Sequence, residues 1–345
     1  MQIEKEWFGK TVILSDHRFS YEEVQHILDS GNASVVKEIS LTEKEYKVSN
    51  DIFDALQKLD KFAKILRKRR MSKGAISFDR VEVKFNLDND NKPESIFFKD
   101  SRDAHKLVEE FMLFANRRVA EFIGKQKPVK SFVYRVHDHP DEDKLNNLKK
   151  IVTNLGYQLN LESKQVNMAL NKLLMDSHGE KEQQLIDTLA IRCMSKAVYT
   201  KDNIGHYGLA FDYYTHFTSP IRRYPDVLVH RLLEFYLSGE DNIDSVALEE
   251  ACLHSSNREQ LATKAERDSI KYMQVKFMED KIGQSFDGII SGVTDRGLFV
   301  EIIENKCEGL VRITEMNGDY FVYDEEIHGL IGYRTKKIYQ FGDPV

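Results

Sequence analysis

The sequence predicts an α+β fold in which a large domain of mixed sheets with surrounding helices is followed by a small all-β domain. Apolar residues recur at helical spacing in three long stretches, at residues 51–71, 103–123 and 261–278. From Gly283 onward, short segments alternate apolar and polar residues, which is typical of strands. We therefore expect two domains, at residues 1–282 and 283–345.

The composition limits where the protein works and what it binds. The formal net charge is −6 over 345 residues, so any nucleic-acid binding must come from local basic patches. Cys193, Cys252 and Cys307 lack CxxC spacing, which argues against a zinc knuckle and fits a reducing cytoplasm. No apolar run approaches the ~20 residues that span a bilayer. We expect a cytoplasmic protein with no membrane partner.

The first segments carry clear local signals. Residues 11–15 (TVILS) predict a strand. Ser20 followed by Glu23 predicts a capping box at a helix start, and Gly31 predicts the end of that helix.

Two further regions have readable patterns. Residues 74–98 predict a hairpin around a polar turn at Asp88–Pro93. Residues 142–200 predict helices, with breaks at Gly156 and at His178–Gly179.

The helix at 51–71 has a face of like charges opposite its apolar stripe. The basic residues are Lys58, Lys61, Lys64, Arg67, Lys68, Arg69 and Arg70. Such a run is usually a solvated face, but a single-sign run in an acidic protein also fits a patch that follows a nucleic-acid backbone.

The helix at 103–123 is apolar nearly all round its middle and is therefore expected to be buried. Glu109 and Asn116 lie seven residues apart and so share a face. Buried Glu and Asn side chains are costly without hydrogen bonds, so both need partners. A nearby arginine is one option for Glu109.

The densest polar and aromatic stretch is residues 205–231, GHYGLAFDYYTHFTSPIRRYPDVLVHR. It predicts a strand at Leu209–Tyr214 and a turn at His216–Ser219. Pro225 suits only the first turn of a helix, so the next helix is expected to begin there.

Arg222 and Arg223 then lie just before that helix N-terminus, the end of the dipole that favours anions. Two guanidinium groups and free backbone N–H groups would form a phosphate cradle there. The alternative is a solvated loop with two charged residues.

Residues 205–231 resemble the signature of the RNase II/RNase R family of exoribonucleases, the RNB domain. Other segments resemble the family in the same order: SDHRFSYEEVQHIL, GAISF, EEFMLFAN, LAIRCMSKAVYT and AERD. The resemblance implies hydrolysis of single-stranded RNA from the 3′ end to nucleoside 5′-monophosphates, by a two-metal mechanism with Mg²⁺. It also implies a monomer for the complete enzyme.

The resemblance implies a catalytic role for Arg222, as the donor aimed at the scissile phosphate. Arg223 would support Arg222 or meet a neighbouring phosphate, and so counts as an RNA-binding residue.

Further RNA-binding roles follow from the other matched segments. Tyr21 and Glu109 would pair to select 2′-hydroxyl sugars, and Asn116 belongs to the same pattern as Glu109. Phe78 would stack a base, and Glu266 would hold the terminal nucleotide. Taken alone, each of these residues is equally an ordinary structural one.

Residues 283–345 resemble the S1-type OB fold that follows the RNB domain in this family. Phe299 occupies the place of a base-stacking aromatic residue. Arg296 and Arg312 stand where an aromatic residue and a histidine are usual, and arginine can still stack or contact phosphate. The chain stops at Val345, before the last strand that such a barrel needs, so we expect a truncated OB fold.

The family holds its metal ions with an Asp-rich motif that lies upstream of every segment matched here. The paired aspartates of this chain have capping or turn contexts instead: Asp51 and Asp54, Asp88 and Asp90, Asp141 and Asp143. We therefore expect the Mg²⁺ ligands upstream and a chain that is inactive alone. A catalytically inactive RNA-binding module is the alternative, and an enzyme completed in trans is a third.

Overall fold

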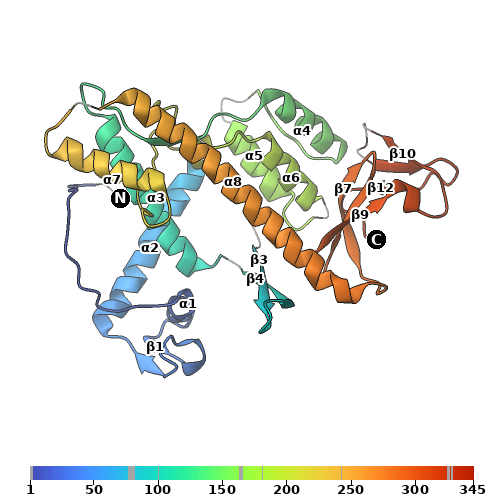
Figure 1. Ribbon diagram of the computed structural model, residues 1–345, viewed down its shortest axis with the longest axis horizontal. Helices are drawn as coiled ribbons and strands as arrows, with labels where there is room; N and C mark the ends of the chain where they lie inside the picture. The colour runs from blue at the N-terminus through green and yellow to red at the C-terminus, as the bar shows by residue number, and fades with distance from the viewer. Residues whose placement is uncertain are drawn as a thin grey trace.

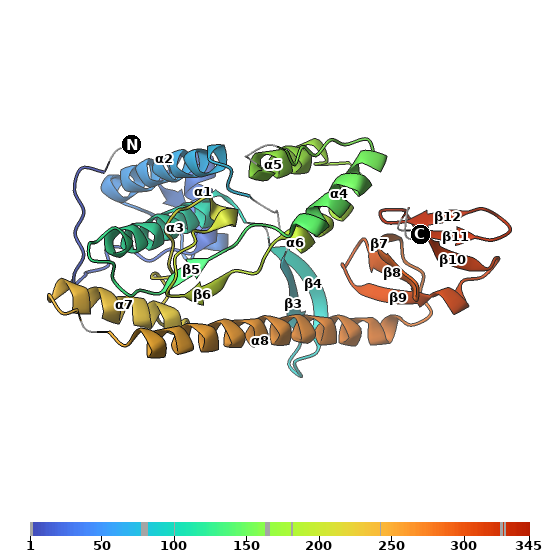
Figure 2. The same ribbon diagram turned by 90° about the horizontal axis from the view of Figure 1, so that it is seen from above.

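The computed structural model describes residues 3–76, 82–99, 101–162, 166–180, 182–241, 243–324, 327 and 329–345. The molecule is elongated, with a mixed α/β part at one end and a small β domain at the other (Figure 1). The long helix α8 (Ser245–Met278) runs along one side and leads from the first part to the second (Figure 2). This α+β arrangement confirms the predicted fold class.

The N-terminal elements form a small unit. They are α1 (Tyr21–Ser30), β1 (Ser34–Val35), η1 (Lys37–Ile39) and β2 (Tyr46–Lys47). The predicted capping box is present, because Ser20 Oγ accepts from Glu23 N at 3.1 Å and Glu23 Oε2 accepts from Ser20 N at 2.6 Å. Gly31 ends the helix in the left-handed region. Ile27 and Val35 are fully buried against the start of the next helix.

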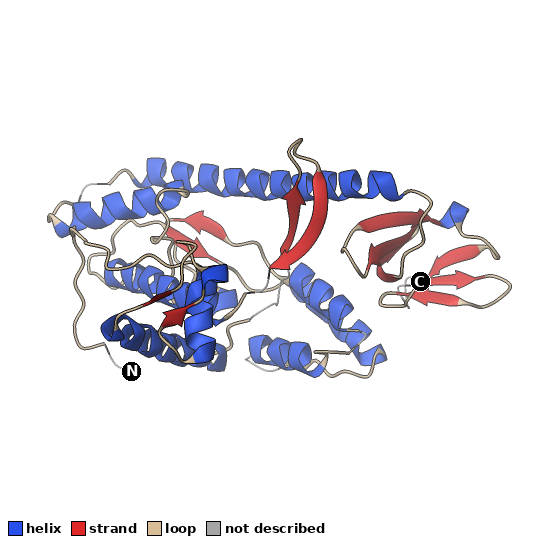
Figure 3. Cartoon of the chain, turned by 90° about the horizontal axis from the view of Figure 1, so that it is seen from below, coloured by secondary structure: helices blue, strands red, loops and turns tan. Residues whose placement is uncertain are grey.

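Helices α2 (Asn50–Ser72) and α3 (Asp103–Gly124) pack side by side (Figures 1 and 2). Their bounds match the predicted helices within one residue at each end. Between them in sequence, β3 (Glu82–Leu87) and β4 (Pro93–Lys99) form the predicted antiparallel hairpin. The hairpin stands apart from the other sheets and lies beside α8 (Figure 3).

A second helical group follows. It contains α4 (Glu142–Asn154), α5 (Val166–Asp176) and α6 (Gln183–Cys193), packed around the buried side chains of Leu148, Leu170 and Ile186. The breaks predicted at Gly156 and Gly179 are confirmed, with φ angles of 90° and 83°.

A further core packs around a short two-stranded sheet and the helices α7 and α8. Strand β5 (Tyr134–Val136) pairs antiparallel with β6 (Val198–Thr200), although we had predicted helix up to residue 200. Phe132 and Val133 are buried against Val229 of α7 (Tyr224–Leu237) and Cys252 of α8. Helix α7 begins one residue before Pro225, as the proline indicated.

The C-terminal domain consists of two three-stranded antiparallel sheets. One contains β7 (Gly288–Thr294), β8 (Gly297–Ile302) and β9 (Glu308–Arg312); the other contains β10 (Phe321–Asp324), β11 (Gly329–Gly332) and β12 (Ile338–Gln340). The short 3-10 turns η3 (Glu279–Lys281) and η4 (Ile313–Glu315) flank the first sheet. Ile290, Leu298, Phe321 and Leu330 form the core between the sheets.

The last residues of the chain pair with β7, and the truncation of the OB fold stays a prediction. Gly288 N donates to Val345 O, and Val345 N donates to Gly288 O, both at 2.9 Å. Pro344 also forms a bridge with Ile289. Composition alone gave no sign of this pairing, because residues 341–345 are not a strand pattern.

Two predicted strands are wrong. Residues 11–15 form no strand, and Val12, Ile13 and Leu14 are exposed, because no strand of the described chain lies beside them. Leu209–Tyr214 is not a strand either. The segment starts in the 3-10 turn η2 (Tyr207–Leu209), which is followed by Ala210 at φ 54°, and Tyr214 O accepts from Arg135 N of β5 at 2.9 Å. Among the described helices, none has the length and apolar character to cross a membrane.

Candidate nucleic-acid site

The site is built on the loop that follows Tyr214 and leads into α7. Asn116 of α3 is only 3% exposed, and its side chain bonds to this loop. Its Oδ1 accepts hydrogen bonds from Phe217 N at 2.9 Å and Thr218 N at 3.1 Å. Its Nδ2 donates to Tyr214 Oη at 3.2 Å. Both ends of the amide bond to the protein, so Asn116 holds the loop, and its RNA-binding role stays a prediction.

Asp226 fixes the other end of the loop. Its fully buried carboxylate lies in the first turn of α7, where the helix dipole favours a negative charge. Oδ1 accepts from Ser219 N at 2.7 Å and from Arg223 Nη2 at 2.8 Å, and Oδ2 accepts from Arg223 Nε at 2.8 Å. This bidentate pair commits the guanidinium of Arg223 to the loop itself.

Arg222 is presented differently. Its side chain is exposed, and it forms no hydrogen bond or ion pair with the residues that the structure describes. Only its backbone N–H is used, donating to Ser219 O at 3.3 Å. Within the predicted phosphate cradle, Arg223 is thus held by Asp226, and the contact of either guanidinium with phosphate stays a prediction. Asp226 neutralises Arg223 and occupies the helix end, which leaves the Arg222 guanidinium as the cation that the loop offers.

The side of the loop that faces α7 is also held. The ring of His230 stacks on Phe217, with centroids 4.1 Å apart and planes at 13°, and His230 Nε2 lies 2.8 Å from Phe217 O. Thr215 Oγ1 donates to Val133 O at 2.6 Å. A side chain carried by a loop fixed at so many points loses less conformational freedom when it meets a ligand.

A polar network connects the loop to α8. Tyr199 Oη lies 2.8 Å from His216 Nδ1, and the Arg135 guanidinium lies 4.5 Å from the centroid of the Tyr199 ring. Arg135 also forms two hydrogen bonds with Glu259 of α8, at 2.6 and 3.1 Å. The loop, the two-stranded sheet and the long helix are therefore joined by charge-assisted contacts.

The histidines beneath the loop are uncharged at neutral pH. Burial lowers the pKa of His206 to about 3. Burial, helped by the charges of Arg223 and Arg135, lowers the pKa of His216 to about 2, and Arg222 contributes in the same direction. Neutral rings keep their acceptor nitrogens, and His206 Nδ1 accepts from Leu209 N at 3.2 Å.

Tyr21 lies at the start of α1 against α3. Its ring stacks on His105, with centroids 4.1 Å apart and planes at 12°, and the tyrosine remains partly exposed. His105 lies one helical turn before Glu109, on the same side of α3. The ribose-reading pair of Tyr21 and Glu109 stays a prediction, because the structure records no bond between them.

The buried glutamate of α3 is Glu110, and our expectation for Glu109 is corrected. The Glu109 side chain is 54% exposed, whereas that of Glu110 is 4% exposed. Arg70 Nη2 lies 2.5 Å from Glu110 Oε1 and 3.8 Å from Glu109 Oε1. Arg70 is itself buried, so it leaves the basic face predicted for α2 and forms a buried ion pair instead.

Two predicted RNA-binding residues are not tied to the loop by the structure. Phe78 lies outside the described residues, which resume at Glu82. Glu266 is exposed on α8, where it has no ion pair with any described side chain.

The C-terminal domain places its three predicted residues near one another. Phe299 of β8 pairs across the sheet with Leu310, and Gly297 pairs with Arg312, so Phe299 and Arg312 share one face. Leu298 points the other way into the core. Arg296 is exposed in the turn before β8, and its carbonyl accepts from Ile313 N at 2.9 Å. A ring and two guanidinium groups thus lie at one end of this sheet.

Within the described ranges, no group of three His, Cys, Asp or Glu side chains is placed to hold a metal ion. The buried carboxylates of Asp226 and Glu110 are already paired, with Arg223 and with Arg70. These residues do not fit a Mg²⁺ site.

The structure thus presents an exposed arginine on a loop fixed by Asn116 and Asp226 and, in the separate C-terminal domain, a ring and two arginines at one end of a sheet, which are groups typical of nucleic-acid-binding proteins. Residues 1–239 match the RNB domain and residues 279–339 match the S1 RNA binding domain. The first match covers more than half of the chain, and the chain therefore belongs to the RNB family.

Its relatives include ribonuclease R of Aquifex aeolicus, 38% identical over 97% of this chain and 46% of that protein, and ribonuclease R of Thermotoga maritima, 37% identical over 96% and 46%. The chain thus spans about half the length of these relatives. Among solved structures, Mycoplasma genitalium RNase R in complex with ribose methylated single-stranded RNA has a TM-score of 0.83 and 28% identity, over 96% of this chain and 51% of that one. Yeast Ssd1, a pseudonuclease, shares the fold at 20% identity, with a TM-score of 0.65 over 90% and 37%.

Sequence reasoning missed Asp226, Glu110 and the pair of Arg135 with Glu259. Asp226 had a local signal, since it follows Pro225 in the first helical turn and lies three residues after Arg223. The pair of Arg135 and Glu259 spans 124 residues and has no local signal.

Proposed function

We propose that this chain is the RNA-binding part of a 3′→5′ exoribonuclease that hydrolyses single-stranded RNA to nucleoside 5′-monophosphates. The observation that carries the proposal is the exposed guanidinium of Arg222 on a loop held by Asn116 and Asp226. A positioned cation of this kind can stabilise the charge that develops on phosphoryl oxygens.

The other RNA-binding residues complete the proposal. Tyr21 and Glu109 would read the ribose, Phe78 would stack a base and Glu266 would hold the terminal nucleotide. In the C-terminal domain, Phe299 would stack a base, with Arg296 and Arg312 nearby for phosphate contacts. The bound strand in the Mycoplasma genitalium RNase R structure supports single-stranded RNA as the ligand.

The test is the Arg222→Ala variant, assayed for trimming of 3′-labelled single-stranded RNA in Mg²⁺. The assay needs the family's Asp-rich motif, supplied either in a longer form of the chain or by a second polypeptide. We expect turnover to fall by about 10²–10³-fold, as for the loss of one oxyanion donor. Arg231→Ala, which removes an exposed arginine of α7, is the matched control. Absence of activity with an intact Asp motif would refute the proposal.

A second candidate is a catalytically inactive RNA-binding module. It is favoured by the lack of a metal-holding cluster in the described part of the chain. This candidate predicts salt-dependent RNA binding by the chain alone, without Mg²⁺-dependent cleavage. Turnover by the chain alone would exclude it, and a chain that does not bind RNA would contradict both candidates.

A further inference from the structure

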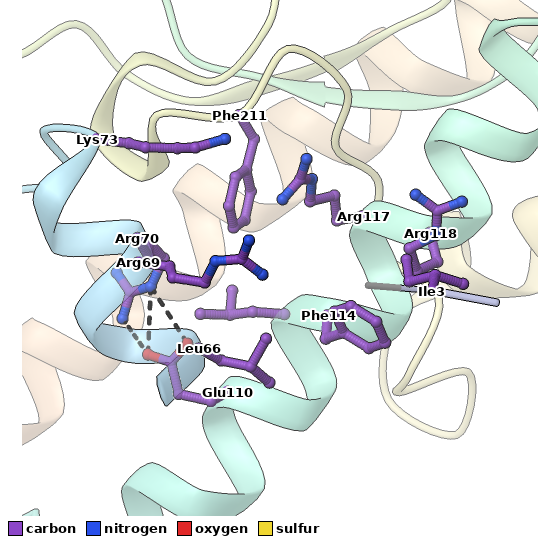
Figure 4. Close-up of a pocket in the computed structure, with 11 residues that line it drawn as sticks. Ile3, Leu66, Arg69, Arg70, Lys73, Glu110, Phe114, Arg117, Arg118 and Phe211 are labelled. Atoms are coloured by element: carbon purple, nitrogen blue, oxygen red, sulfur yellow. Dashed lines mark hydrogen bonds and ion pairs between the residues drawn. The ribbon is translucent and has the colours of Figure 1, made fainter. Parts of the chain in front are cut away.

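A cavity of about 220 Å³ lies between α2 and α3, beneath the segment that leads to the Arg222 loop (Figure 4). The last turns of α2, the middle of α3 and Phe211 form its walls. The lining residues that matter here are Arg69, Arg70, Lys73, Phe114, Arg117 and Phe211. Tyr21 and the C-terminal sheet do not line this cavity, so the residues assigned above do not explain it.

Most of the cations in the cavity are held by carboxylates. Arg70 contacts Glu110 on the floor, as the dashed lines in Figure 4 show. Arg117 Nε donates to Glu121 Oε1 at 2.9 Å. Arg118, at one end of the cavity, contacts the same Glu121 and also Glu6 at 2.8 Å. These pairs fix the guanidinium groups in place around the empty volume.

Lys73 has a different role. It follows the last residue of α2, its side chain is exposed, and it forms no ion pair with any described residue. Figure 4 shows the Lys73 side chain extending along the rim toward Phe211. Glu110, Glu121 and Glu6 offset the charges of Arg70, Arg117 and Arg118, which leaves the Lys73 ammonium at the rim as a cation that can attract an anion into this space.

The aromatic wall indicates which anion. The Arg117 guanidinium lies 5.1 Å from the centroid of the Phe211 ring, and Phe114 lines the side opposite Lys73. Ring faces and guanidinium planes are the surfaces on which nucleobases stack. A cation at the rim and rings on the wall therefore match a phosphate that is attached to a base.

We propose that this cavity binds a nucleotide phosphate, with Lys73 and Arg117 contacting the phosphate oxygens and Phe211 contacting the base or sugar. The proposal rests on the proposed function in one respect, that RNA or its hydrolysis product supplies the nucleotide. The phosphate could belong to a bound RNA strand or to a released nucleoside 5′-monophosphate, and the two sources are separated experimentally.

The experiment titrates the chain with adenosine 5′-monophosphate, adenosine and a single-stranded RNA, by calorimetry at low salt. Lys73→Ala is expected to weaken binding of the monophosphate by about tenfold or more, as for one hydrogen bond to a charged group. Adenosine binding is expected to change little, and Lys73→Arg is expected to restore the monophosphate affinity. Lys150→Ala, which removes an exposed lysine of α4, is the matched control.

The RNA arm identifies the source. If the cavity holds a strand phosphate, Lys73→Ala lowers RNA affinity and reduces the salt slope by about 0.7. If it holds the released product, monophosphate affinity falls while RNA affinity is kept. Phe211→Leu is a second variant and is expected to reduce the preference for the monophosphate over inorganic phosphate.

The proposal is overturned if Lys73→Ala and Lys150→Ala bind the monophosphate and the RNA equally well. In that case, if Arg222→Ala still weakens RNA binding, the proposed function is retained and only the nucleotide cavity is rejected. If the unaltered chain does not bind RNA, the proposed function is refuted, whatever the monophosphate titration shows.

Discussion

At the scale of single residues, α3 separates the roles of two neighbouring glutamates. Glu110 points into the protein and pairs closely with the buried Arg70, while the Glu109 side chain is 54% exposed and lies 3.8 Å from the same arginine. Neighbouring helix positions differ by about 100° in direction, so a shift of one residue exchanges the inner and outer sides. Which glutamate is buried depends on where α2 places Arg70.

The first prediction compares these two positions. Glu110→Ala leaves the buried Arg70 with only the more distant and exposed carboxylate of Glu109, at 3.8 Å, so we expect the free energy of unfolding to fall by about 3 kcal/mol. Glu109→Ala, on the exposed neighbour, should change it by less than about 0.5 kcal/mol. Urea unfolding followed by circular dichroism measures both. Equal losses in the two variants would contradict the assignment.

The second prediction concerns Asn116. Asn116→Ala removes the acceptor of two loop N–H groups and the partner of the Tyr214 hydroxyl, at about 1–3 kcal/mol for each buried group left unsatisfied. We expect a lower urea midpoint and weaker RNA binding through Arg222. Asn147→Ala, at an exposed position of α4, is the control. An unchanged midpoint for Asn116→Ala would show that the amide does not hold the loop.

At the scale of elements, the loop depends on neutral histidines below it. His206 accepts a backbone hydrogen bond through Nδ1, and His216 meets the Tyr199 hydroxyl through Nδ1. Protonation of either ring at Nδ1 would remove the acceptor for Leu209 N or for the Tyr199 hydroxyl, and it would place a positive charge in the interior close to Arg135. The packing of β5, β6 and the loop therefore links the stability of this region to pH.

The third prediction gives the direction of that pH dependence. The unfolded chain binds a proton at His206 near pH 6.5, whereas the folded chain does so only near pH 3. The unfolded state thus binds more protons between these values, so the free energy of unfolding falls as pH is lowered from 6.5. The expected slope is up to ~1.4 kcal/mol per pH unit for each buried histidine. Urea midpoints at pH 7.5, 6 and 5 check it.

The His206→Asn variant provides the comparison for that measurement, since its amide oxygen can accept from Leu209 N without titrating. Its stability should depend less steeply on pH over the same range. Identical slopes for the two proteins would rule out His206 as the source.

At the scale of the whole molecule, the Arg222 loop and the C-terminal sheet lie toward opposite ends of α8 (Figure 2). A helix of 34 residues is about 51 Å long at 1.5 Å per residue. Under the proposed function, a short RNA would engage one of the two surfaces, and only a long strand would engage both. Binding to two linked surfaces raises affinity without any new contact.

The fourth prediction uses this separation. Phe299→Ala should weaken binding of a long single-stranded RNA by about 1–3 kcal/mol, the value of one stacked base. The loss should be smaller for an RNA too short to reach beyond the Arg222 loop. Fluorescence anisotropy with both lengths measures the difference, and Tyr320→Ala, at another exposed aromatic residue of the same domain, is the control. Equal losses for both lengths would contradict two separate surfaces.

Local interactions made much of this protein predictable from its sequence. The capping box at Ser20 and the helix start at Pro225 follow from contacts within a few residues. The spans of α2 and α3 and of the strands β7 to β9 follow from the spacing of apolar residues along each segment. The signature around Arg222 also placed the chain in its family, since that pattern is contained in one continuous segment.

The tertiary structure alone decided what each functional side chain meets. Asp226 holds the guanidinium of Arg223, Arg70 pairs with Glu110, and Glu259 bonds to Arg135, which is 124 residues away in the sequence. Residues 11–15 have a strand-like sequence but no described partner strand. Residues 343–345 have no strand pattern, yet their backbone bonds to β7. Helix periodicity and capping act between neighbours in sequence, whereas burial, charge pairing and strand pairing depend on residues that only the folded chain brings together.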